Sequence, residues 1–216
     1  MGLTVKTEPY SLAPMAPALP PRKRLQILDG ARATFGELGY ERASVDLIAA
    51  RAGVSKATVY NHFADKKALF FAAFSDEADS VRDELRRSLA DAGGDLRDAL
   101  QRVGEQLVRV LVSPAFVALY RHTSAEAARF PELGATLFSR GPEVVYGAVA
   151  AWLERWQAQG ALRLDDSRSA AVQFVLLCQG DLVVRAQLGI DSSPADDRVR
   201  DTVRRAVRTF VRAYSP

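Results

Sequence analysis

Hydrophobic positions in the first third of the chain recur every three or four residues, the period of one helical face. One stripe predicts a helix over residues 22–38, with Gly39 as its C-terminal stop. Ser44 is placed to cap a short second helix that ends at Gly53, and Ser55 is placed to cap a third. Two short helices joined by a tight, glycine-containing turn are typical of a helix-turn-helix.

The same signals predict helices along the rest of the chain, where proline and aspartate mark their starts. We expect these helices at residues 65–89, 95–112, from 114, from 131, 142–159, 165–188 and 194–214. Alternating β-branched runs and hairpin turns are nearly absent from the sequence. The predicted fold is therefore all-α, with nine or ten helices.

This pattern divides the chain into three parts. Residues 1–21 are rich in Pro, Ala and Ser without periodicity, which predicts a disordered arm. Residues 22–67 are expected to form a three-helix domain that contains the helix-turn-helix. Residues 68–216 are expected to form a second, larger helical domain.

Polar side chains with hydrogen-bonding or charged groups are concentrated on the predicted third helix. At 100° per residue Val59 and Phe63 share one face, which we expect to be buried, while Ala57 and Asn61 point away from it. Polar side chains flank that outward ridge on both sides: Lys56, Thr58, Tyr60 and His62. An amide can pair with an adenine edge and a methyl can touch a thymine methyl, while ammonium, hydroxyl and imidazole groups suit phosphates. Ser44 and Lys66, at neighbouring helix N-termini, favour phosphate too.

Charge supports a polyanionic partner. Residues up to Phe70 contain ten Lys and Arg against six Asp and Glu, and all five lysines lie at or before Lys67. A basic N-terminal region joined to a nearly neutral remainder is typical of proteins that bind nucleic acid. No apolar run reaches the ~20 residues that cross a bilayer, so we expect no membrane partner. A single cysteine, Cys178, fits a reducing, cytoplasmic location.

The stretch "FGELGYERASVDLIAARAGVSKATVYNHFADKKALF", residues 35–70, resembles the DNA-binding domain of the TetR family of transcriptional repressors. The resemblance implies that Thr58, Tyr60, His62 and Lys66 contact backbone phosphates, while Lys56, Ala57 and Asn61 lie nearest the bases. Residues 119–142 are similar to one sub-group, the AefR-like regulators. The family implies that residues 22–67 are a DNA-binding domain and that residues 68–216 are a ligand-binding and dimerisation domain. It also implies a homodimer through the last two helices, a palindromic operator, and release by a small effector.

Two features of the C-terminal half agree with a homodimer. The last helix has an apolar stripe that includes Val199, Val203 and Phe210, and the helix before it is apolar nearly all round. A helix that is apolar on most sides must pack against other elements on most sides. Burial inside a monomer would explain the same pattern.

We expect a hydrophobic effector in a cavity of the body. Candidate wall residues are aromatic or small: Phe116, Tyr120, Phe138, Trp152, Phe174 and Cys178, with His122, Arg121 or Gln173 at a polar edge. Ordinary core packing is the alternative for each of them.

An enzyme is disfavoured, because the chain has two histidines and lacks a phosphate-binding glycine loop, a zinc motif and a nucleophile elbow. We expect neither a cofactor nor a metal. The acids of "EAARFPE", residues 126–132, are interpreted as paired surface carboxylates. A helical protein-interaction module with a basic head remains the alternative function.

Overall fold

The computed structural model describes residues 21–75, 85, 87–90 and 94–216, and within these ranges it contains eleven helices and no strand. The prediction of an all-α fold with an N-terminal helix-turn-helix is confirmed. The predicted arm lies outside the described residues except for Pro21, where the first helix begins.

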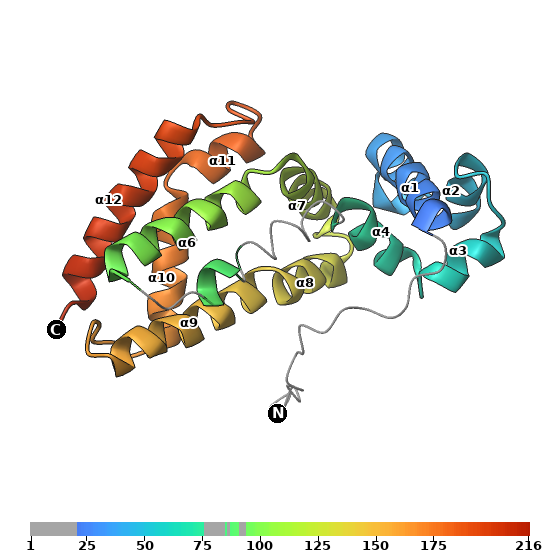
Figure 1. Ribbon diagram of the computed structural model, residues 1–216. Coiled ribbons are helices and arrows are strands. Elements are labelled where there is room, and N and C mark those ends of the chain that lie inside the picture. The colour runs from blue at the N-terminus through green and yellow to red at the C-terminus, as the bar shows by residue number, and fades with distance from the viewer. Residues whose placement is uncertain (1–20, 76–84, 86, 91–93) are drawn as a thin grey trace.

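The first four helices form one end of the molecule, which we call the head (Figure 1). They are α1 (Pro21–Arg42), α2 (Val45–Arg51), α3 (Lys56–His62) and α4 (Lys66–Ser75). Hydroxyls cap two of them as predicted: Ser44 Oγ accepts from Leu47 N, and Ser55 Oγ accepts from Thr58 N, each at 3.1 Å. Each cap satisfies a first-turn N–H that has no partner inside its helix.

The remaining helices form the body. They are α6 (Leu96–Leu111), α7 (Pro114–Glu126), α8 (Pro131–Arg140), α9 (Pro142–Ala158), α10 (Ser167–Gln179), α11 (Leu182–Gln187) and α12 (Asp196–Tyr214). Asp95, Ser113 and Asp166 cap α6, α7 and α10 as their sequence positions predict. In Figure 1, α12 lies far from the head, and α4 and α7 lie where the head meets the body.

Two glycines change the predicted helix boundaries. Gly39, with φ of 74°, interrupts the helical backbone where a C-terminal stop was predicted, but α1 continues past this kink to Arg42. Gly180, with φ of 51°, divides the helix predicted over 165–188 into α10 and α11. These left-handed conformations are accessible to glycine at little cost. The division at Gly180 explains why the helices exceed the predicted nine or ten.

Buried side chains form two clusters, and neither coincides with a simple sequence boundary. The head cluster contains Ile27, Phe35, Ile48 and Phe70, and it also takes in Leu119 from α7 and Leu133 from α8. The body cluster gathers side chains of α6, α9, α10 and α12. The head core is therefore completed by the body, although the domain limits themselves stay a prediction.

In the described ranges, no single helix combines the length and apolar character needed to cross a membrane; the bent pair α6 and α7 meets that test only when its two helices are taken together.

Candidate nucleic-acid interface

The orientation predicted for α3 is confirmed. Val59 and Phe63 are buried in the head cluster, whereas Ala57 and Asn61 are exposed and Tyr60 keeps 48% of its surface accessible. Val59 on α3 and Phe63, the residue that follows the helix as its C-cap, anchor this side and leave the opposite face of α3 to solvent. The outward face therefore presents a methyl, an amide and a phenol together.

Thr58 and His62 lie on the other flank of α3, where both are half-buried. The Thr58 hydroxyl is 2.8 Å from Ser55 Oγ, the same atom that caps the helix. This contact holds the threonine rotamer in place. A hydroxyl can bridge such a neighbour and still bond to a third group.

Lys56 does not extend freely into solvent. Its Nζ lies 2.9 Å from Asp46 Oδ2 on α2, and this hydrogen bond raises the pKa of the lysine. Both side chains are largely exposed, so the pair contributes little to folding stability. Its effect is to hold the lysine between α2 and α3.

Lys66, at the start of α4, is also engaged. Its Nζ donates to the Glu41 carbonyl at 3.0 Å and lies 4.6 Å from the centre of the Tyr40 ring. Burial lowers the pKa of this lysine. The residue predicted to contact phosphate therefore also joins α4 to the end of α1.

The corner between α7 and α8 fastens the body to that same point. Glu126 Oε1 accepts the Tyr40 N–H at 3.0 Å, Arg129 forms an ion pair with Glu41, and the Phe130 ring meets the Tyr40 ring edge-on at 5.3 Å. We call Glu126, Arg129 and Phe130 the corner latch. The sequence interpretation of Glu126 as a surface acid missed this contact, because no motif indicates which distant N–H a carboxylate meets.

The six residues predicted to line an effector cavity lie in different environments. Trp152, Phe174 and Cys178 belong to the buried body cluster, and Phe116 is half-buried. Tyr120 and Phe138 are exposed, at 39% and 53%. The two cavities described below have none of the six in their walls. The assignment of these residues to an effector stays a prediction.

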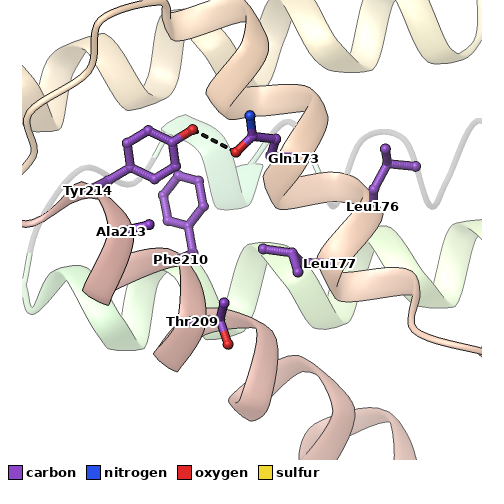
Figure 2. Close-up of a pocket in the computed structure, with 7 residues that line it drawn as sticks. All are labelled: Gln173, Leu176, Leu177, Thr209, Phe210, Ala213 and Tyr214. Atoms are coloured by element: carbon purple, nitrogen blue, oxygen red, sulfur yellow. Dashed lines mark hydrogen bonds between the residues drawn. The ribbon is translucent and has the colours of Figure 1, made fainter.

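A groove of about 460 Å³ runs between α10 and α12 (Figure 2). Its walls include Leu176 and Leu177 from α10 and Phe210 from α12, and at one end Tyr214 Oη donates to Gln173 Oε1 at 2.8 Å. Figure 2 shows Leu176 and Leu177 on α10, across from Thr209 and Phe210 on α12. The groove is largely apolar and lies on the helices predicted to form the dimer.

The apolar stripe of α12 has a different role from the one we expected. Val199, Val203 and Phe210 are buried within the protomer, where α12 packs on α6 and α10. Several other apolar residues of this region are exposed, on α10, α11 and the loop after α11: Leu176, Leu177, Val184, Leu188 and Ile190. These five residues are the large exposed apolar side chains of the helices predicted to form the dimer and of the loop that joins them.

Within the described ranges, no three His, Cys, Asp or Glu side chains are grouped so that they could hold a metal ion. The α3 surface offers hydrogen-bond donors and acceptors on a convex helix.

Comparisons with known proteins agree with this geometry. Residues 27–73 match the family of bacterial regulatory proteins of the tetR type, and residues 98–216 match the AefR-like transcriptional repressor C-terminal domain. A Mycobacterium tuberculosis protein, HTH-type transcriptional repressor Rv1474c, is 44% identical over 59 residues, which cover 27% of this chain and 32% of the relative. The chain thus spans about a third of the length of that curated relative.

Two solved structures match nearly the whole fold. The flavonoid-responsive regulator FrrA is 30% identical with a TM-score of 0.75, over 90% of this chain and 98% of its own. A TetR-family regulator from Mesorhizobium loti is 26% identical with a TM-score of 0.76 over the same shares.

Fold and surface together define a helix-turn-helix transcriptional regulator rather than an enzyme. The chain belongs to the TetR family, and its C-terminal domain is of the AefR-like type. Membership of this family of transcriptional regulators confirms the prediction that the protein is not an enzyme.

Proposed function

We propose that this protein is a ligand-responsive transcriptional repressor that binds a palindromic operator as a homodimer. The observation that carries the proposal is the face of α3: Val59 and Phe63 anchor the helix, and Ala57, Tyr60 and Asn61 project together into solvent. A short helix held this way is the shape that enters a major groove.

The proposed contacts divide into two kinds. Ala57 and Asn61 lie on the outward ridge and read base edges, with Lys56 beside them. Thr58, Tyr60, His62 and Lys66 contact phosphates, and Ser44 adds the N-terminus of α2. Phosphate contacts fix the position of the protein but carry little sequence information.

A homodimer would present a second copy of α3, the helix proposed to read the operator. Leu176 and Leu177 on α10 line the groove and are exposed, as is Val184 on α11, and a second copy of this chain would cover them. Two heads on one dimer select a palindrome whose half-sites match their separation.

The effector is a small and predominantly hydrophobic molecule. The similarity to a flavonoid-responsive regulator supports ligand control of this kind. We retain Phe116, Tyr120, Phe138, Trp152, Phe174 and Cys178 as candidate contacts, reached by movement of α7, α8 and α10. Ligand and operator must favour different orientations of the head for binding of one to release the other.

The test uses fluorescence anisotropy with DNA from the protein's own promoter. Tyr60→Ala should weaken binding to all sequences about equally, because it removes a phosphate contact. Asn61→Ala should change the preferred base at one position of each half-site, by about 1–3 kcal/mol of discrimination.

Gln159→Ala is the control, since Gln159 is an exposed amide at the C-cap of α9, outside the head. It should bind DNA as the unaltered protein does. If Tyr60→Ala and Asn61→Ala also leave the titration unchanged, α3 is not the reading helix, and a protein-interaction role for the basic head becomes the better hypothesis.

A further inference from the structure

A cavity of about 280 Å³ lies where α1, α4 and α7 meet. Its wall includes Arg32 and Gly36 from α1, Phe74 from α4, and Pro114, Ala118 and His122 from α7. We call it the junction cavity. Because head and body both contribute to its wall, any molecule inside it would contact both.

Arg32 supplies a fixed positive group. Its Nε donates to the Ala73 carbonyl at 2.6 Å and its Nη1 to Asp29 Oδ1 at 3.2 Å. In the described part of the chain, Nη2 has no such partner. Two bonds therefore orient the guanidinium, and its remaining donors are available to an acceptor in the cavity.

His122 supplies the second polar group. Its ring lies 5.0 Å from that of Phe74, tilted by 33°, and within the described ranges it makes no hydrogen bond. Burial, followed by the nearby Arg121 charge, lowers the pKa of this histidine, while Glu126 opposes the shift. This shift favours the neutral imidazole, which carries one N–H donor.

The other surfaces of the cavity are apolar. Phe74, Pro114 and Ala118 form a wall without hydrogen-bonding side chains, and the first turn of α7 lies at Pro114. Since a water molecule takes up about 30 Å³ in the liquid, the space is equivalent to about nine waters. A ligand of roughly that many non-hydrogen atoms fits.

We propose that the junction cavity binds a small carboxylic acid with an apolar body. The carboxylate lies between Arg32 and His122, and the apolar part lies against Phe74 and Ala118. Hydrogen bonds between a guanidinium and a carboxylate are charge-assisted and strong, the small cavity and its apolar wall suit a small organic acid, and a neutral imidazole can donate a second bond. His122 is also a candidate for the polar edge of the effector cavity, whereas the six candidate wall residues of that cavity lie outside this site.

Its effect on DNA binding rests on the proposed function. An occupant in contact with α1, α4 and α7 favours one orientation of the head relative to the body. By linkage, the acid then changes operator affinity, and the operator changes affinity for the acid by the same factor.

Binding is tested on the full chain by calorimetric titration with benzoate and hexanoate, using benzamide and hexanamide as uncharged comparators. At least one carboxylate should bind tenfold or more tightly than its amide. Arg32→Gln should remove that preference, and thermal unfolding of this variant should show that it remains folded.

Gly36→Leu fills the cavity without disturbing α1. In the described ranges nothing lies within 4 Å of a Cβ added at Gly36, and replacing a mid-helix glycine favours the helix. Binding should fall at least tenfold. Gly147→Leu on α9, another helical glycine with open space around its Cβ, should bind the acid normally.

Equal binding of each acid and its amide, or benzoate and hexanoate binding that survives Gly36→Leu, would overturn the assignment. A parallel operator titration keeps the two proposals apart. Operator binding without carboxylate binding rejects the junction site alone, whereas carboxylate binding without operator binding supports the site and contradicts the repressor function.

Discussion

Lys56 and Lys66 show that charged residues near the proposed DNA surface already have partners in the free protein. Lys56 pairs with Asp46, and Lys66 donates to the Glu41 carbonyl. A phosphate must replace or share these partners. The net gain from each contact is therefore smaller than that of an unpaired lysine, because a bond within the protein is lost as one to DNA forms.

The orientation of α3 was predictable because it depends on local periodicity alone. Val59 is buried on α3, and Phe63 is buried as the next residue after the helix, so Asn61, two positions from each, points away from the core. The environments of Phe138 and Cys178 were not predictable in the same way. Whether an apolar side chain faces a core, a cavity or solvent depends on elements distant in sequence.

Cys178 provides a test at the scale of one residue. It is fully buried, and burial raises the pKa of its thiol well above the ordinary range. Because the thiolate is the reactive form, we expect negligible labelling by a thiol reagent in native buffer at pH 8. Labelling should become complete in denaturant, which serves as the control because the chain has one cysteine. Rapid labelling of the native protein would contradict the buried placement.

Among the elements, the corner latch between α7 and α8 has the clearest consequence. Glu126, Arg129 and Phe130 contact Tyr40 and Glu41, immediately after the bend at Gly39. A Cβ added at Gly39 would lie 2.7 Å from Glu126 Oε1, in addition to the strain of its left-handed backbone. The bend and the latch thus form one structural unit.

The starts of helices were predictable from their capping residues, whereas the contact between the bend at Gly39 and the corner latch was not. Ser55, Asp95 and Asp166 act within three residues of their own positions, so the sequence contains all the information. Glu126 and Tyr40 are 86 residues apart, and only the packing of α7 on α1 brings them together. The break at Gly180 was missed for a related reason, since the apolar pattern continues across it.

Removing the Glu126 carboxylate should weaken both folding and operator binding. Glu126→Ala leaves the Tyr40 N–H without its acceptor, which we expect to cost about 1 kcal/mol in the free energy of unfolding. It should also weaken operator binding a few-fold, because the head is held less firmly. Chemical denaturation and anisotropy measure the two effects.

Glu132→Ala removes the other acid of the same segment and serves as the control. Glu132 is exposed at the start of α8, so the variant should resemble the unaltered protein in both measurements. Equal losses in the two variants would mean that general charge, not the latch, is responsible.

At the scale of the whole molecule, the distribution of exposed apolar residues favours a symmetric pair. Leu176, Val184, Leu188 and Ile190 lie on α10, α11 and the following loop, each with about half or more of its surface accessible. Exposed apolar patches of this kind are typical of interaction surfaces. The reading heads lie at the other end of each protomer, so this contact would set their separation (Figure 1).

Leu176→Asp tests the proposed dimer. The unaltered protein should have about twice the chain mass of 23.6 kDa in light scattering. The variant should scatter as a single chain at micromolar concentration, because a buried carboxylate without a partner disfavours association. Phe138→Asp, at a similarly exposed site on α8, should leave the mass unchanged. A single-chain mass for the unaltered protein would contradict the dimer.

The corner latch also limits how such regulators can be recombined. A chimaera that joins residues 21–75 of this chain to the body of a relative would keep the helix-turn-helix intact. In this chimaera, residues of the relative would replace Glu126, Arg129 and Phe130 as the contacts of Tyr40 and Glu41. Residues 126–130 should therefore be transplanted together with the head, so that a new reading helix is held at its native angle.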